Sequence, residues 1–251
     1  MLRLVTRLSR RALYPVFVLL AWSAAPAYSE ARITSTEYLE PTSRYNHAVL
    51  GPDAEWGALR ITVQGCADCT GDNSKSILFR LPSERVFEDL APRLVDLDAD
   101  GAPEVVTIEA HTNYGARLAV YGTDGVITAT PYIGRSYRWL APIGAADLDG
   151  DGKTEIAYID RPHLAKTLRI WRYDAAQLSE VAVARGLTNH KIGEDFISGG
   201  LRDCGTGPEL ITADSGWTRV IATSFAGGEL AHKDIGAFDG PRSLEQALAC
   251  K

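Results

Sequence analysis

The sequence lacks an excess of basic residues, and this absence limits the partners that it can bind. It contains 26 lysine and arginine residues against 32 aspartate and glutamate residues, which gives a formal net charge of −6. Proteins that hold nucleic acid by its phosphates carry basic patches or stripes. The chain as a whole therefore gives no electrostatic reason to expect a nucleic-acid partner.

The sequence also lacks the short motifs of the common catalytic centres. No H-x-x-x-H metal pair and no G-x-S-x-G nucleophile motif is present. The conspicuous acids belong to repeated loops, so no carboxylate pair for glycoside cleavage stands out. We predict no catalytic residues, and an enzymatic activity stays open without being favoured. If the chain is an enzyme, loss of activity on changing His111 or His190 would indicate it.

Long apolar runs are scarce, and the exception lies near the N-terminus. Four arginines precede the run "ALYPVFVLLAWSAAPA", and no acidic residue occurs before Glu30. A basic start, a short apolar stretch and small residues are typical of a secretory signal peptide, which we assign to residues 1–29. Cleavage after Ala27 or Ser29 fits this pattern. We therefore predict an exported protein, periplasmic or secreted, with no stable membrane insertion after cleavage.

Removal of the signal peptide makes the chain more acidic. Residues 1–29 contain four arginines and no acid, so 26 − 4 leaves 22 basic residues, and 22 − 32 gives a net charge of −10. This charge suits solubility and cation binding better than anionic partners. We expect a monomer.

Cysteine is scarce too, with four residues in all. An even number in an exported chain predicts two disulfides, and proximity favours Cys66–Cys69 and Cys204–Cys250, although four cysteines allow three connectivities. A redox C-x-x-C motif usually opens a helix, whereas the loop-like "TGDNSKS" follows Cys69. The second pair has no zinc-ligand spacing.

What the sequence does contain is an internal repeat of about 50 residues. Glu104 and Glu155 are 51 residues apart, Glu209 follows 54 later, and Glu55 lies 49 before Glu104. Repeats of this length indicate solenoids or propellers. The repeat divides one domain, residues 30–251, into four units at approximately 44–90, 91–140, 141–194 and 195–238.

Each unit contains four short strand candidates. In the third they are "APIGAADL", "EIAYID", "TLRIWRY" and "SEVAVAR"; in the first they are "HAVL", "GALRITVQ", "SILFRLP" and "ERVFED". Four-stranded units at this period predict an all-β fold, a β-propeller of about four antiparallel blades. Residues 31–43 could add a strand or complete the last blade, so five blades are possible. The repeat argues against a two-sheet sandwich, and residues 243–249 predict a short C-terminal helix.

Two acidic loops stand at the same position in consecutive units. Aspartates occupy loop positions 1, 3 and 5, a glycine occupies position 6 and a glutamate position 9. Carboxylates at alternate positions can turn inward around one hard cation such as Ca²⁺. An EF-hand is excluded because position 12 is not acidic and strand-like segments follow both loops. The predicted ligands are Asp96, Asp98, Asp100 and Glu104 in one loop, and Asp147, Asp149, Asp151 and Glu155 in the other.

These loops, "DLDADGAPEVV" and "DLDGDGKTEIA", resemble the calcium loops of FG-GAP or VCBS repeats in integrin-α-like β-propellers. The resemblance implies that each loop joins the first two strands of a blade and that its cation clamps the hairpin. It implies the eight ligands above and two structural Ca²⁺ sites. The first and fourth units keep too few acids, and we predict no metal there.

Three functions remain open. The first is a calcium-stabilised, non-enzymatic binding or scaffolding module for an unknown protein or glycan. The second is a carbohydrate-binding propeller, for which Tyr137 and Trp139 in "PYIGRSYRW" would supply aromatic surface, although packing explains Trp139 equally well. The third is a propeller enzyme, a lyase or hydrolase.

Overall fold

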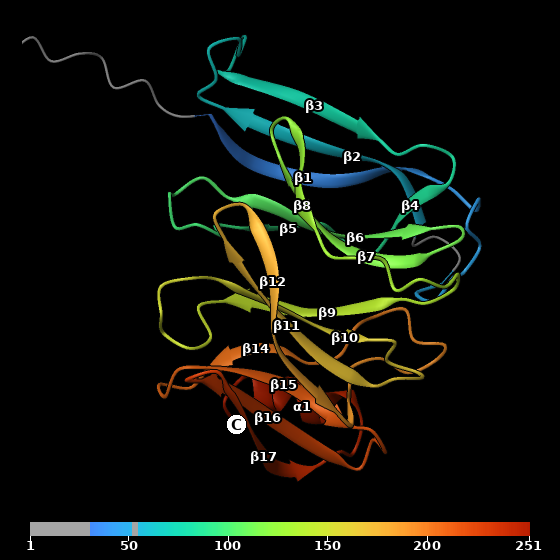
Figure 1. The fold of residues 1–251 in the computed structure, drawn as a ribbon, viewed down its shortest axis with the longest axis vertical. Coiled ribbons are helices and arrows are strands. Elements are labelled where there is room, and N and C mark those ends of the chain that lie inside the picture. The colour runs from blue at the N-terminus through green and yellow to red at the C-terminus, as the bar shows by residue number, and fades with distance from the viewer. Residues whose placement is uncertain (1–30, 52–54) are drawn as a thin grey trace, which may run out of the picture.

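Short antiparallel strands make up most of the chain, as its alternation of β-branched residues and turn residues predicts. The computed structural model describes residues 31–51 and 55–251, which contain strands β1–β17 and helix α1 (Figure 1). The predicted signal peptide lies outside the described residues. Within them, no helix is long and apolar enough to span a membrane.

The first sheet joins two of the predicted units. Its strand order is β1-β2-β4-β6-β7-β8, with β3 paired to β2 and β5 paired to β6. The strands are β1 (Arg32–Pro41), β2 (Glu55–Gln64), β3 (Ser74–Arg80), β4 (Arg85–Glu88), β5 (Arg93–Val95), β6 (Glu104–His111), β7 (Gly115–Gly122) and β8 (Gly125–Ala129).

The other two sheets each follow one predicted unit. The second is a meander in chain order, β9-β10-β11-β12, and in the third β15 lies between β14 or β13 on one side and β16 on the other. Their strands are β9 (Leu140–Ala146), β10 (Glu155–Asp160), β11 (Thr167–Asp174), β12 (Gln177–Arg185), β13 (Leu187–Thr188), β14 (Gly200–Asp203), β15 (Pro208–Asp214), β16 (Arg219–Ala226) and β17 (Glu229–Ala237).

The second strands of the units form the core. All six residues of β10 are buried, and β6 is buried from Glu104 to Ala110. A strand covered on both faces needs a continuous apolar run, which "EIAYI" and "EVVTI" provide. One apolar cluster runs from Leu97 through Ile159 to Phe225, so the stacked units share a core.

The first unit differs from the prediction. Residues 47–50 ("HAVL") form no strand beyond an isolated bridge between Val49 and Gly51. Instead β1 pairs along β2, and β4 pairs with β2 on one side and with β6 on the other. A strand has two hydrogen-bonding edges, so β4 can join two units into one sheet.

The arrangement is an open stack, and the predicted closed ring of four or five blades is not its overall shape. Figure 1 shows the units in chain order along the longest axis, with β3 and β17 near opposite ends. Among the described residues, β17 pairs only with β16. Strand β1 could have completed the last blade, but it pairs with β2. The described residues therefore form an all-β fold of stacked antiparallel sheets with one short helix.

The predicted cysteine pairs and C-terminal helix are present. The Cα atoms lie 5.1 Å apart in Cys66–Cys69 and 5.8 Å apart in Cys204–Cys250, and both pairs are disulfides. Helix α1 (Pro241–Leu248) packs Leu244 and Ala247 against β15 and β16. The second disulfide therefore fastens the end of the helix to the loop between β14 and β15.

Candidate metal centre

The first acidic loop connects β5 to β6 and draws three carboxylates together. One oxygen from each of Asp96, Asp98 and Asp100 lies within 4.8 Å of the others. The loop is held locally, since the Asp96 Oδ2 accepts a hydrogen bond from the Gly101 amide at 3.0 Å and the Asp100 Oδ1 accepts one from Ala102 at 2.7 Å. These are short-range turn contacts that aspartate forms readily.

The second acidic loop repeats this arrangement between β9 and β10. Asp147, Asp149 and Asp151 likewise place one oxygen each within 4.8 Å of the others. Asp147 accepts hydrogen bonds from the amides of Gly150 at 2.8 Å, Asp151 at 3.1 Å and Gly152 at 2.9 Å. The sequence thus predicted both aspartate groups, and the structure brings each of them together.

The glutamates at loop position 9 contact the backbone of their own loops. Glu104 accepts from the Leu97 amide at 3.0 Å, and Glu155 accepts from the Leu148 amide at 2.8 Å. Burial raises the pKa of both carboxyls, and the neighbouring aspartates add to this rise. Neither glutamate belongs to the close aspartate groups, so their direct role as ligands stays a prediction.

Arg172 distinguishes the second loop from the first. This β11 residue lies opposite Glu155 and donates to its Oε1 at 2.5 Å. The same guanidinium contacts Asp149 at 2.5 Å and Asp151 at 3.1 Å. In the first loop the position that corresponds to Arg172 is Gly122, because Tyr121 lies opposite Val105 and Gly122 is the next residue along. Glycine supplies no charge there.

One oxygen of the second loop has no protein partner. The side chain of Asp149 is 9% exposed, and its Oδ1 is buried without a hydrogen bond in the described part of the chain. A buried carboxylate oxygen without a partner is costly. Oxygen donors at this density fit a hard cation such as Ca²⁺, and the donor set passes this chemical test.

The fourth unit lacks a comparable acid group. Asp203 accepts from the amides of Gly205 at 2.8 Å and Gly207 at 3.1 Å, while Glu209 is paired with Arg202 at 2.7 Å. Cys204 occupies part of this loop through its disulfide. The loop is closed by backbone contacts and a covalent bond.

Comparison with protein families finds a similarity in the part of the chain that contains the two acidic loops. Residues 96–158, which contain both loops and the intervening blade-like unit, match the family model described as FG-GAP-like repeat. Residues 96–158 are thus similar to an FG-GAP-like repeat, and we call them the FG-GAP-like region. The resemblance that the two loops indicate is thereby confirmed for this part of the chain. Outside this region, the FG-GAP-like character of the first and fourth units stays a prediction.

Other comparisons add little to the FG-GAP-like region. No curated protein matches the chain. One similar solved structure is an exo-beta-1,3-galactanase from Phanerochaete chrysosporium with beta-1,3-galactotriose, at 16% identity and a TM-score of 0.41. The match covers 82% of this chain and 49% of the galactanase chain, so the protein spans about half of that enzyme's length.

The two aromatic candidates for sugar binding, Trp139 and Tyr137, differ in how much of their side chains is exposed. Trp139 is 2% exposed, and its Nε1 donates to the carbonyl of Glu88 at 2.8 Å, so it packs between units and offers no sugar platform. Tyr137 is 51% exposed and stacks on Tyr45 with ring centroids 5.2 Å apart. Only Tyr137 keeps the surface that carbohydrate stacking requires.

The candidate histidines are not arranged around a nucleophile. The Nδ1 of His111 accepts from the Asn113 amide at 3.0 Å. His190 is buried, and its Nδ1 lies 2.8 Å from the Nε2 of His163. Burial lowers the pKa of His163 to about 4 and also lowers the pKa of His190. Both rings of this pair are therefore neutral near pH 7.

A histidine–glutamate pair escaped prediction from sequence. The Nδ1 of His47 lies 2.5 Å from Oε1 of Glu88, a side chain 1% exposed. Burial raises the pKa of Glu88 to about 7, against the lowering effect of His47. The two residues are 41 positions apart and belong to no motif in the sequence, so only the fold brings them together.

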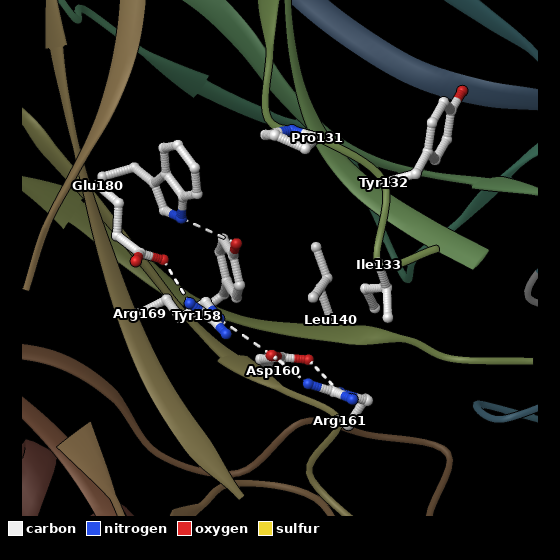
Figure 2. Close-up of a pocket in the computed structure, with 10 residues that line it drawn as sticks. Pro131, Tyr132, Ile133, Leu140, Tyr158, Asp160, Arg161, Arg169 and Glu180 are labelled. Carbon is white, nitrogen blue, oxygen red and sulfur yellow. Dashed lines mark hydrogen bonds and ion pairs between the residues drawn. The ribbon is translucent and has the colours of Figure 1, made fainter. Parts of the chain in front are cut away.

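Figure 2 shows a cavity of about 280 Å³ beside the FG-GAP-like region, formed by β9–β12 and the segment before β9. Its charged groups are mutually paired: Asp160 contacts Arg161 at 2.7 Å and Arg169 at 3.0 Å, and Arg169 contacts Glu180 at 2.5 Å. The Trp171 Nε1 donates to the Tyr158 hydroxyl at 2.8 Å. The cavity thus combines aromatic rings with a balanced polar network.

Proposed function

We propose that the protein is an exported, calcium-stabilised module of FG-GAP/VCBS type, with propeller-type blades, that binds or scaffolds a partner without catalysing a reaction. The observation that carries this proposal is the pair of aspartate groups at equal register in consecutive units. Two disulfides fit an oxidising, extracytoplasmic compartment.

The chain's own residues define what a cation would do. Asp96, Asp98 and Asp100 would hold it in the first loop, and Asp147, Asp149 and Asp151 in the second. Calcium supplies positive charge at the point where like-charged carboxylates converge. Because each loop joins two core strands, relief of this repulsion stabilises the strand pair, and the predicted role is structural.

The test is thermal melting of chelator-treated protein during a calcium titration. At about 100 times the dissociation constant, binding adds roughly 2.7 kcal/mol per site, so the melting temperature rises. Asp96→Asn combined with Asp147→Asn removes charge but keeps an oxygen that accepts the loop amides, and this variant should lose most of the rise. Asp174→Asn removes an exposed carboxylate paired with Lys153 and is the matched control. Absence of any calcium-dependent shift would overturn the metal proposal.

A second candidate, carbohydrate binding, rests on the cavity of Figure 2. Trp171 offers partly exposed ring surface, while Arg161 and Arg169 offer polar groups that can orient hydroxyls. Glycan-array binding that is lost on Trp171→Ala, with the fold intact by circular dichroism, would favour this function. Unchanged binding in that variant would place the glycan elsewhere.

A further inference from the structure

Two neighbouring cavities at the end of the sheets opposite the acidic loops share part of their lining, and we describe them together as one groove. One has a volume of about 30 Å³ and the other about 210 Å³, and both are lined by Pro162 and His163. The remaining walls come from the β10–β11 and β15–β16 turns, from segments before β9 and after β13, and from His47 and Val49 in the connection between β1 and β2. We call this feature the basic groove.

The basic groove carries positive charge without acidic residues. Four cationic side chains line it: Arg138, Arg161, Lys166 and Lys191. No aspartate or glutamate of residues 31–51 and 55–251 lines it. Arg161 is neutralised by Asp160, but the other three form no salt bridge within residues 31–51 and 55–251. In a chain with excess acid, such a local reversal of charge attracts anionic groups.

Contacts to the protein hold these unpaired cations in place. The Lys166 Nζ donates to the carbonyl of Ser215 at 2.6 Å, and the Arg138 Nη1 donates to the carbonyl of Tyr137 at 2.7 Å. The Lys191 ammonium lies 4.7 Å from the ring centroid of Trp217, within cation–π range. Fixed charges lose less conformational freedom when a ligand binds.

The groove also exposes large apolar side chains. Ile192 is 82% exposed, Leu164 is 63% exposed and Tyr137 is 51% exposed. Ile192 and Leu164 are the two most exposed of the large hydrophobic side chains among the described residues. Apolar and aromatic residues beside arginine are characteristic of protein-binding surfaces.

Part of the groove lining has a strained backbone. Four non-glycine residues that line the groove have left-handed backbone conformations: Tyr137 (φ 52°), Arg161 (φ 49°), Lys166 (φ 47°) and Trp217 (φ 56°). Such conformations cost free energy and cluster where a side chain must be presented in a particular direction. The amide of Tyr137 donates to the Tyr45 hydroxyl at 2.7 Å, which supports this conformation.

We propose that the basic groove binds an acidic protein segment in which carboxylates alternate with apolar side chains. This inference rests on the binding function proposed above and adds its surface and ligand class. Unpaired lysine and arginine complement the carboxylates, and the exposed aliphatic side chains complement apolar residues. Leu164 and Ile192 distinguish this ligand from an anionic glycan, because aliphatic side chains provide no flat ring for a sugar and no partner for its hydroxyls.

The test is peptide selection on the full chain without its signal, in calcium-containing buffer, using a random-peptide display library. Selected peptides should combine aspartate or glutamate with leucine, isoleucine or aromatic residues. Their affinity, measured by fluorescence polarisation with the synthetic peptide, should fall about tenfold or more in the Lys166→Glu and Lys191→Glu double variant. Higher salt should weaken binding to the native chain.

The matched control reverses two basic residues outside the groove, Lys233→Glu and Lys251→Glu. It changes the net charge equally and should bind the peptide like the native chain. Equal loss in both double variants would show a non-specific charge effect and overturn the proposal. The proposal would also be overturned if the library yielded no peptides that combine acidic and apolar residues. It would be overturned too if the protein bound heparin or polygalacturonate in place of peptide and this binding depended on the two lysines.

Melting of each variant confirms that it is folded, and a third variant, Ile192→Ser, tests the apolar contribution without changing charge. The affinity of this variant for the selected peptide should be several-fold lower, and unchanged affinity would contradict the proposed ligand chemistry. Calcium-dependent melting is measured separately. Calcium stabilisation without peptide binding would overturn this inference alone, whereas peptide binding without calcium stabilisation would overturn only the metal proposal.

Discussion

The guanidinium of Arg172 donates a hydrogen bond of 2.5 Å to the carboxylate of Glu155. Because it also contacts Asp149 and Asp151, it places a fixed positive charge beside the second acidic loop. A cation bound there would meet repulsion that is missing from the first loop, where Gly122 takes the equivalent place. The two repeated loops are therefore electrostatically unequal.

We expect Arg172→Gln to strengthen calcium binding at the second loop by about tenfold or more, since like unit charges about 4 Å apart repel each other by about 1 to 4 kcal/mol near a protein surface. Isothermal titration calorimetry of the Asp96→Asn background, which isolates the second loop, measures this affinity. Arg169→Gln is the control, because Arg169 lies on the same strand but pairs with Asp160 and Glu180. Equal affinity in Arg172→Gln and the parent would contradict the inequality of the loops.

The disulfide between Cys204 and Cys250 closes a segment of 46 residues. Replacing both cysteines with serine should lower the free energy of unfolding by about 4 kcal/mol, because the unfolded chain regains the entropy of that loop. Urea denaturation measures the loss. The same replacement at Cys66 and Cys69 opens a much shorter loop and should cost about 2 kcal/mol. A larger loss from the short loop would contradict this expectation.

Gly115 allows a close approach between β7 and the segment before β9. Its φ is 72°, and a Cβ there would lie 2.1 Å from the carbonyl oxygen of Arg135. Gly115→Ala should therefore destabilise the protein by more than the roughly 1–2 kcal/mol of a left-handed residue alone. Gly134→Ala is the control, because its φ is also positive but its Cβ would meet no atom within 4 Å. Chemical denaturation that ranks the two variants equally would be inconsistent with the close contact.

The His163–His190 pair should make the fold sensitive to acid. The pKa of His163 falls from 6.5 to about 4 on folding, so the unfolded chain binds the proton more tightly between these values. Stability contributed by the neutral ring is complete above about pH 6.5 and decreases as the pH falls toward 4. Glu88 acts in the opposite direction, because its raised pKa adds stability as the pH falls below about 7.

A comparison of variants separates these effects. The unfolding free energy of His163→Gln, measured at intervals from pH 7 to pH 4, should fall less steeply than that of the native chain. In Glu88→Gln, which keeps an oxygen near His47, the loss on acidification should be steeper. Parallel curves for the native chain and His163→Gln would show that this histidine does not set the acid sensitivity.

Much of the candidate metal centre could be predicted because its interactions are local. Asp147 accepts hydrogen bonds from amides three to five residues away, and Asp96 accepts one from the Gly101 amide, five residues away. Turn chemistry of this kind depends on a short stretch of sequence, so two copies 51 residues apart predict two similar carboxylate groups. The burial of β6 and β10 could be predicted for the same reason, from their continuous apolar runs.

Tertiary structure alone decided the overall arrangement of the units. The residues of β4 pair with two strands from different parts of the chain, and β1 pairs with β2 although the sequence also allowed it to complete the last unit. Strand edges form the same hydrogen bonds with many partners, so local sequence does not select among them. The contact of Arg172 with the acidic loop likewise depends on the register of β10 and β11, and the pairing of His47 with Glu88 depends on how the connection between β1 and β2 packs against β4.

The sequence by itself therefore determined the all-β class, the repeated aspartate loops and the short C-terminal helix, and it favoured the observed cysteine pairing among three possible ones. Each of these depends on near neighbours, periodicity or a small number of possible partners. The open stack, the neutralising arginine and the basic groove arise only in the folded chain. Each of them brings together side chains from separate strands and turns, and their distances are set by the packing of whole sheets.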